Sequence, residues 1–209
     1  MADLFEPEWD DHLKPLIEEY KNRHHPLSYK NLYQLIVMVV LSAQDSDKHI
    51  NEVAPPFFAA FPNFASIAAA QPEDLHPYLR GVRNFGNKCT WLHATAQKLG
   101  GGNISLAMDA LTALSGIGRK SANVIRREMK EPAEGIIVDL HVLRVVPRLG
   151  ISQAKDATRM EKDLMKVISR PLWHHVGMSI SFLGREICRP TNPKCGECIM
   201  QAHCAFANS

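Results

Sequence analysis

The chain has 209 residues, of which 45% are apolar and 22% charged, and its formal net charge is +2. This is the composition of an ordinary globular protein, long enough for one large domain or two small ones. No apolar run reaches the roughly 20 residues that span a bilayer, and the acidic start MADLFEPEWDD is unlike a signal peptide. We therefore expect a cytoplasmic protein without a membrane partner, in which any nucleic-acid binding comes from a local basic face.

The apolar periodicity is helical nearly throughout, and no long alternating run indicates a strand. The clearest helix with a buried face lies in YKNLYQLIVMVVLSAQ, residues 29–44. Pro55 and Pro56 are expected to break the pattern that follows it. The fold class is therefore all-α. Further helices are predicted at residues 86–99, 106–114, 119–130, 139–149, 155–169 and 172–187.

Residues 114–125, LSGIGRKSANVI, place two glycines around an apolar residue directly before a helical pattern. We expect the two glycines, Gly116 and Gly118, to let the turn adopt positive φ and to bring bare backbone close to a ligand. The amide groups at the start of the next helix would then favour an anion such as a DNA phosphate. The pattern predicts a helix-hairpin-helix, and a turn that only reverses the chain is the alternative.

Lys120 follows in the first turn of the second helix of this hairpin, beside Arg119. The positive end of the helix dipole and the neighbouring guanidinium both disfavour an ammonium group there. Lys120 is therefore a candidate for a reactive amine. A surface lysine that binds phosphate is the plainer interpretation.

Asp139 lies in IIVDLHVLRV, residues 136–145, after three apolar residues and before a helical pattern. This position predicts an N-cap. A carboxylate at the mouth of an apolar segment could also lie opposite Lys120 across a cleft and stabilise a cationic sugar. The spacing of the two residues does not decide between these roles.

Four of the five cysteines lie in CRPTNPKCGECIMQAHC, residues 188–204. In a reducing compartment such a cluster indicates a metal or catalysis before disulfides. Four thiolates suit a [4Fe-4S] cluster or a tetrahedral zinc ion. The candidate ligands are Cys188, Cys195, Cys198 and Cys204. The fifth cysteine, Cys89, is expected to be a small apolar core residue.

Together, LSGIGRKSANVI, VDLHVLRV, LSAQDSD and the C-x6-C-x2-C-x5-C tail resemble endonuclease III, a family of helix-hairpin-helix DNA glycosylases, in the same order and over nearly the whole chain. The resemblance implies two all-α domains with a DNA cleft between them. Residues 25–135 would form a six-helix barrel that includes the hairpin, and residues 1–24 and 136–209 an iron-sulfur cluster domain. It favours a [4Fe-4S] cluster over zinc at the four cysteines.

The resemblance also implies an enzyme of base excision repair, monomeric and associated with the nucleoid, that acts on double-stranded DNA containing a damaged base or an abasic site. Lys120 would attack C1′ of a nucleotide flipped out of the stack, expel the base and form a Schiff base. Asp139 would stabilise the cationic sugar and assist lysine deprotonation. A β-elimination would then nick the strand, and oxidised or ring-saturated pyrimidines are the expected substrates.

Further DNA contacts are also implied. Gln44, in the LSAQ motif, is a candidate for filling the gap left by the flipped base, and a polar residue at a helix end is the plainer alternative. Arg189 and Lys194 lie between the first two cysteines, where they would touch phosphates. The remaining candidates are Gly116, Ile117, Gly118, Arg119 and His141.

The sequence departs from the family pattern at four positions. Leu140 stands where a small hydroxyl residue is typical, and Asn84 where we expect an apolar wedge; Arg126 and Arg127 add charge to a helix that is usually more apolar. These positions bear on the substrate more than on the reaction class. Two alternatives are a monofunctional mismatch glycosylase of the same superfamily and a non-catalytic cluster-bearing protein for DNA binding or redox sensing.

Overall fold

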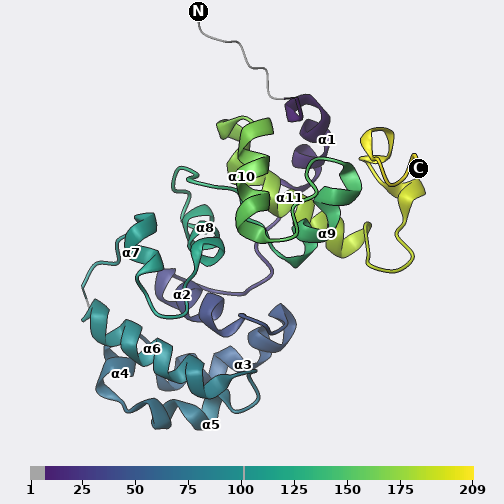
Figure 1. Ribbon diagram of the computed structural model, residues 1–209. Coiled ribbons are helices and arrows are strands. Elements are labelled where there is room, and N and C mark those ends of the chain that lie inside the picture. Colours follow the sequence, from purple (N-terminus) through teal and green to yellow (C-terminus); the bar gives the residue numbers. More distant parts are fainter. Residues whose placement is uncertain (1–7, 101) are drawn as a thin grey trace, which may run out of the picture. The chain divides into compact units, whose positions relative to one another are not determined.

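The computed structural model of the chain describes residues 8–100 and 102–209, which form helices and loops without any strand (Figure 1). This confirms the predicted all-α class. Most of the acidic start, and the first seven residues of the predicted cluster domain, lie outside the described residues. No helix in the described ranges is long and apolar enough to cross a bilayer.

The chain forms two compact units, each with its own buried apolar core. Residues 24–131 make up the first, which we call the hairpin unit. Residues 8–23 and 132–209 belong to the second, which we call the cysteine unit. The predicted boundaries at residues 25 and 135 fall in the same two connecting segments.

The hairpin unit is built around α2, Leu32–Leu41, in which eight of ten residues are buried. Such a helix is apolar on all sides, as expected for one surrounded by others. Helices α3, α6 and α8 pack against α2, and α4 lies beside α6 (Figure 1). The other helices of this unit are α3 (Asp47–Ala60), α4 (Phe64–Ala69), the 3-10 helix η1 (Pro72–Leu75), α5 (His76–Leu79), α6 (Phe85–Leu99), α7 (Met108–Thr112) and α8 (Arg119–Glu128).

Helix α3 continues through Pro55 and Pro56, so the predicted break at these residues is wrong. Proline removes a backbone donor and normally disrupts a helix interior. The buried stripe of Ile50, Ala54 and Phe57 spans the two prolines at helical spacing. Phe57 is completely buried, and this packing holds the helix together.

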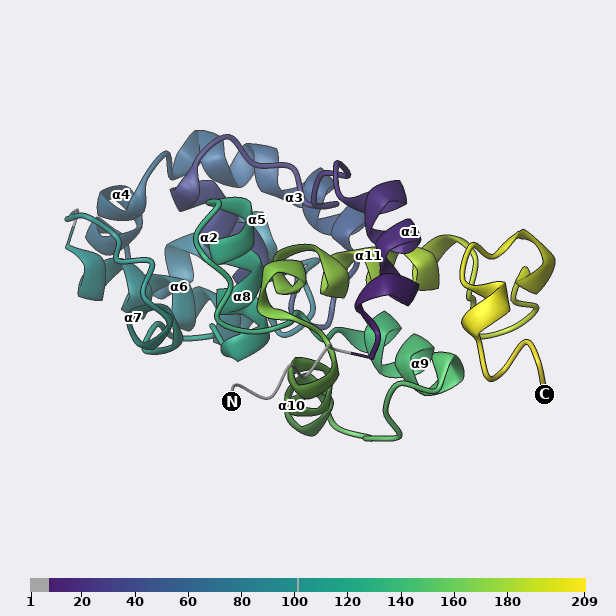
Figure 2. The same cartoon turned by 90° about the horizontal axis from the view of Figure 1, so that it is seen from above.

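The cysteine unit is built around α11, Trp173–Glu186, with nine consecutive buried residues at 176–184. Helices α1 and α9 pack against it. After α11 the chain runs through loops and two short 3-10 helices, drawn in yellow in Figure 2. The other helices of this unit are α1 (Asp10–Tyr20), α9 (Leu140–Leu149), α10 (Ala157–Val167), η2 (Arg170–Leu172), η3 (Cys195–Glu197) and η4 (Gln201–His203).

The six helices predicted from residue 86 onward are all present, each with ends within two residues of the prediction. Residues 136–138 are buried and belong to no helix or strand, and they lead directly to the N-cap of α9. The structure thereby places both candidate catalytic residues in the first turn of a helix or at its N-cap.

Candidate functional site

The turn before α8 depends on Gly116, whose φ is +80°. A Cβ at this position would lie only 2.8 Å from Cε3 of Trp91, so both the conformation and the space require glycine. Gly118 differs, because its φ of −89° is open to any residue, so the positive φ expected of this turn falls on Gly116 alone. Nothing lies within 4 Å of a Cβ at Gly118, which leaves the backbone bare on that side.

The N-terminus of α8 is open to a ligand. Gly118 is the N-cap, and a glycine has no side chain with which to cap the helix. Arg119 and Lys120 follow with exposed side chains, and Ile117 is buried in the core below the turn. Any DNA contact by Ile117 would therefore involve its backbone. Backbone amide groups at a helix N-terminus, beside two basic side chains, are the chemistry that binds a phosphate.

The two extra arginines of α8 are part of the packing of the hairpin unit. Arg126 is buried and donates a hydrogen bond to the carbonyl oxygen of Leu106, which ties α8 to the segment before α7. Arg127 forms an ion pair with Glu128, and the Tyr29 hydroxyl donates to the same carboxylate over 2.6 Å. Both side chains thus contact other parts of their own unit.

Asp139 is the N-cap of α9, as predicted. Its Oδ1 accepts hydrogen bonds from the backbone N–H groups of His141 and Val142, each over 2.9 Å. Its Oδ2 accepts from the hydroxyl of Ser181 in α11, over 2.6 Å. The Asp139 side chain is only 13% exposed, so its carboxylate is held in one orientation.

Leu140 and His141 follow in the first turn of α9. Leu140 is 67% exposed, the most exposed of the large apolar residues in the described ranges. The ring of His141 is half-buried, with Nδ1 lying 3.2 Å from Nη2 of Arg144. The departure at Leu140 therefore creates an exposed apolar side chain directly beside the candidate carboxylate.

Gln44 and Asn84 lie at the tips of two adjacent loops of the hairpin unit, both with left-handed φ values of 60° and 57°. The side-chain amide of Asn84 donates to Oε1 of Gln44 over 3.3 Å. Next to them Asp45 Oδ2 accepts from the backbone N–H of Arg83 over 2.9 Å. The candidate gap-filling residue therefore has a polar partner where an apolar wedge was expected.

Lys88 of α6 holds the start of the loop that carries Gln44. Its ammonium group donates to the carbonyl oxygens of Leu41 and Ala43 over 2.6 and 2.7 Å, at the C-terminal end of α2. The residue is 1% exposed, and this burial lowers the pKa of Lys88 below its ordinary value. The lysine thus satisfies carbonyl groups that a helix leaves without partners at its end.

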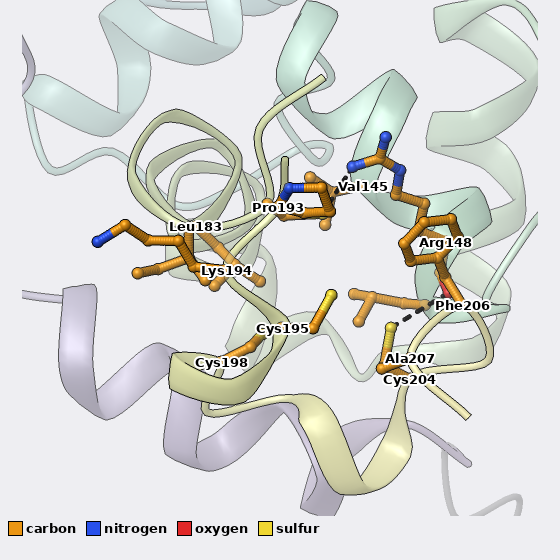
Figure 3. A pocket seen from close by; sticks show the side chains of 13 residues that line it. Val145, Arg148, Leu183, Pro193, Lys194, Cys195, Cys198, Cys204, Phe206 and Ala207 are labelled. Atoms are coloured by element: carbon orange, nitrogen blue, oxygen red, sulfur yellow. Dashed lines mark hydrogen bonds between the residues drawn. The ribbon is translucent and has the colours of Figure 1, made fainter. Parts of the chain in front are cut away.

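The four predicted cysteine ligands line one cavity in the cysteine unit, with a volume of about 340 Å³ including its opening to solvent. Figure 3 shows Cys195 and Cys204 extending toward the same space, with Arg148 and Phe206 beside it. The rest of the lining is mainly apolar. It includes Val145, Leu149, Leu183, Ile187 and Pro193.

This lining fits a cluster held by thiolates, because the donors are four sulfurs and most of the other lining residues are apolar. In the described ranges, no three His, Cys, Asp or Glu side chains converge on the position of one metal ion. Burial raises the pKa of the Cys198 thiol. Cys89 lies elsewhere, in the core of the hairpin unit, where burial raises the pKa of its thiol to about 11, as expected for a core residue.

Arg148 connects the cavity to the loop that carries Arg189 and Lys194. Its Nη1 donates to Sγ of Cys188 over 3.3 Å and to the carbonyl oxygen of Arg189 over 2.7 Å. Its guanidinium also lies 4.8 Å from the centroid of the Phe206 ring. Arg189 is exposed, and Lys194 pairs with Glu197 over 3.1 Å.

The sequence assigns no role to Ser181, Lys88 or Arg148, although Lys88 fits the family pattern and each of the three contacts a predicted site residue or the loop that carries one. For Ser181 a signal exists in the spacing of Gly177, Ser181 and Gly184, which places three small residues on one face of a helix. The other two are ordinary basic residues in helical patterns, which spacing alone does not distinguish.

A hairpin turn that opens a helix N-terminus beside an exposed lysine, together with a cavity of four cysteines in an all-helical chain, is characteristic of helix-hairpin-helix proteins of DNA repair. The family model described as "HhH-GPD superfamily base excision DNA repair protein" matches residues 37–170. Endonuclease III of Synechocystis is 33% identical over 186 residues, which cover 88% of this chain and 85% of the relative. Endonuclease III of Bacillus subtilis is 31% identical, and the match covers 85% of this chain and 83% of the relative.

Solved structures agree. The structure of a trapped endonuclease III–DNA covalent intermediate matches with a TM-score of 0.85 at 30% identity, over 95% of this chain and 94% of the other. A thermostable thymine-DNA glycosylase matches with a TM-score of 0.78 over 95% and 94%, but at 15% identity it supports the fold alone. The chain belongs to the endonuclease III family within the HhH-GPD superfamily. It is an enzyme of base excision repair, of the DNA N-glycosylase and AP lyase class.

Proposed function

We propose that this chain is a bifunctional enzyme that removes oxidised pyrimidines from double-stranded DNA and then cleaves the abasic site through a Schiff base on Lys120. The observation that carries the proposal is the position of the exposed Lys120 in the first turn of α8, at a helix N-terminus whose N-cap is a glycine. A phosphate bound at that N-terminus would hold the sugar of the neighbouring nucleotide within reach of the amine.

Covalent chemistry is supported by one of the similar solved structures, which is a trapped covalent intermediate between an endonuclease III and DNA. In this chain the neutral amine of Lys120 would attack C1′, forming a C–N bond as the C1′–N bond to the base breaks. The base leaves with its electron pair and takes a proton. Opening of the sugar ring then gives the Schiff base, and loss of a proton from C2′ expels the 3′ phosphate.

Asp139 would supply negative charge to the same sugar. Its carboxylate is fixed at the N-terminus of α9, so it needs no reorganisation as positive charge develops on the sugar. The same carboxylate would accept the proton that Lys120 loses before it attacks. These two roles require a rigid carboxylate at the sugar, and the helix cap anchors one of its two oxygens.

Binding of DNA would use both units. Gly116, Gly118 and Arg119 would hold one phosphate at the start of α8, and Gln44 would fill the gap left by the flipped nucleotide. His141, Arg189 and Lys194 would contact the backbone from the cysteine unit. We expect a monomer that acts in the cytoplasm on the nucleoid.

The four cysteines would hold a [4Fe-4S] cluster, which the apolar cavity and its four sulfur donors fit. When bound, the cluster would cross-link η3, η4 and the loop after α11 and so order the loop of Arg189 and Lys194. The cysteines themselves take no part in the reaction at the sugar. In this proposal the cysteine unit is the cluster domain and the hairpin unit is the six-helix barrel.

The test is a panel of duplexes that contain one thymine glycol, one dihydrouracil, one thymine or adenine mismatch, or no lesion. The purified protein should nick the two damaged duplexes without added heat or alkali, and leave the mismatched and intact duplexes whole. Base release that becomes a nick only after alkali would instead identify a monofunctional glycosylase. Binding without base release would identify a non-catalytic protein.

The metal is tested on the same preparation. We expect about four iron and four sulfide per chain and a brown protein, whereas stoichiometric zinc in a colourless, active protein would contradict the cluster assignment.

A further inference from the structure

We infer that Ser181 is a positioning residue for Asp139, whose hydroxyl sets the direction in which the carboxylate faces the reacting sugar. The inference rests on the proposed role of Asp139 and adds the residue that makes this role possible. Ser181 is completely buried in α11, and its Oγ lies 2.6 Å from Oδ2 of Asp139.

The hydrogen bonds on the carboxylate explain why Ser181 is needed. Two backbone N–H groups bind Oδ1 and cap α9, but they leave the carboxyl group free to swing about this single anchored oxygen. The bond between Cβ and the carboxyl carbon is a broad, soft torsion in aspartate. A second anchor on Oδ2 removes that freedom. The Ser181 hydroxyl is this anchor, and it comes from a different helix.

The direction of the Ser181 proton is also determined. The Nε of Arg185, one turn further along α11, lies 3.5 Å from Oγ of Ser181 and can only donate. Ser181 therefore accepts on that side and donates its own proton to Asp139. The Arg185 guanidinium also lies 4.0 Å from Oδ2 of Asp139, which keeps the carboxylate balanced by a positive charge.

The packing of α11 puts the hydroxyl in place. Gly177, Ser181 and Gly184 fall at positions i, i+4 and i+7, so they share one face of the helix. A Cβ at Gly177 would lie 2.4 Å from the carbonyl oxygen of Ile137, and one at Gly184 would lie 2.9 Å from Cβ of His141. The two glycines thus bring α11 close to the segments on both sides of Asp139, against backbone atoms at Ile137 and against a side-chain atom at His141. Only a short side chain between them fits, and serine supplies a donor.

Ser179 offers a matched control on the same helix. It is also buried, at 1% exposed, and its hydroxyl has no hydrogen-bond partner among the described residues. Replacing either serine by alanine removes one buried hydroxyl from α11. Only the change at Ser181 removes a bond to Asp139.

The experiment compares the parent with Ser181→Ala and Ser179→Ala. Three quantities are measured: the single-turnover rate of adduct formation with an abasic duplex in borohydride, the Kd for a duplex with a tetrahydrofuran site, and the Tm. We expect Ser181→Ala to slow adduct formation about tenfold, the effect of one hydrogen bond to a charged group, with the Kd unchanged. Ser179→Ala should match the parent in all three.

A double-mutant cycle separates positioning from stability. In an Asp139→Asn background, Ser181→Ala should have no further effect on the rate, because the two residues act through one bond. If Ser181→Ala does not fold, Ser181→Cys replaces it in the experiment. The thiol is a weaker donor than the hydroxyl, so its rate of adduct formation should lie between that of the parent and a tenfold slower rate.

The inference would be overturned if folded Ser181→Ala formed the adduct at the rate of the parent. It would also be overturned if Ser181→Ala slowed the reaction by the same factor in the Asp139→Asn background as in the parent. In either case, an adduct formed by the parent would leave the proposed function intact. A parent that forms no adduct would overturn the proposed function itself, and this inference with it.

Discussion

Gly177 of α11 lies directly against the backbone of Ile137, two residues before Asp139. A Cβ added to Gly177 would lie 2.4 Å from the Ile137 carbonyl oxygen and 2.8 Å from its nitrogen. Real Cβ atoms do not approach backbone atoms this closely, so a substitution must move one of the two segments. Because residues 136–138 lead straight into the N-cap of α9, the position of Asp139 depends on this glycine.

We therefore predict that Gly177→Ala lowers the free energy of unfolding by about 1–3 kcal/mol, the usual effect of overpacking. Adduct formation with an abasic duplex should slow as well, because α11 carries Ser181. Gly86→Ala is the control, since nothing lies within 4 Å of a Cβ at this helical glycine. The stability of Gly86→Ala should equal that of the parent or be slightly higher. Equal urea midpoints for the two variants would contradict the packing argument.

The two glycines of the hairpin should respond differently to alanine. Gly116→Ala forces a residue with a Cβ to φ +80° and against Trp91, so we predict a loss of stability of at least about 1 kcal/mol. Gly118→Ala meets no atom and should leave the Tm near that of the parent. It should still weaken binding to a tetrahydrofuran duplex, because the methyl group covers bare backbone. A stable Gly116→Ala protein would show that the positive φ is not required.

His25 should make the hairpin unit sensitive to acid. Burial lowers the pKa of His25 to about 4, against 6.5 in an unfolded chain. Between these values the unfolded state binds a proton that the folded state does not, so the free energy of unfolding falls as the pH decreases from 6.5 to 4. The total loss is at most about 3 kcal/mol.

Urea unfolding of the parent, His25→Asn and His24→Asn at pH 7, 5.5 and 4.5 measures this effect. The decrease in the free energy of unfolding between pH 7 and 4.5 should be smaller in His25→Asn than in the parent. Asparagine is chosen because its side-chain oxygen can still accept a hydrogen bond from the N–H of Leu27. The exposed His24 should make no difference. Parallel stability curves for His25→Asn and the parent would contradict the assignment.

Arg148→Met should loosen the cysteine cavity. The change removes hydrogen bonds to Sγ of Cys188 and to the carbonyl oxygens of Arg189 and Pro190, and it keeps most of the stem. Partners of metal ligands commonly affect retention tenfold or more, so visible absorption should decay about tenfold faster in the presence of a chelator. The exposed Arg159→Met is the matched control. Equal decay rates would show that Arg148 does not support the cluster.

Much of the fold and of the site follows from local sequence. Helix positions follow from apolar spacing, and the N-cap at Asp139 follows from a polar residue between an extended and a helical apolar segment. Local reasoning fails at Pro55 and Pro56, where the tertiary packing of Phe57 outweighs the missing donors. It predicts the positive φ of the hairpin turn but does not say which glycine carries it: Gly116 does, whereas Gly118 has an ordinary φ and open space at its Cβ position.

The bond between Ser181 and Asp139 could not be predicted in the same way. It joins residues 42 positions apart, and only the packing of α11 against residues 136–145 brings them together. The same is true of Lys88 and the end of α2, which are 45 to 47 positions apart in sequence. Local patterns thus identify which residues begin a helix, while the contacts that orient them are set by the fold.

The most direct test of the central claim is borohydride trapping on a duplex with one abasic site, using the parent, Lys120→Ala and Lys30→Ala. The exposed Lys30 carries the same charge in the same unit and has no role in the proposed chemistry. We predict a covalent protein–DNA adduct with the parent and Lys30→Ala, and none with folded Lys120→Ala that still binds a tetrahydrofuran duplex. An adduct of parent yield in Lys120→Ala would show that another amine is the nucleophile, and would contradict the proposed mechanism.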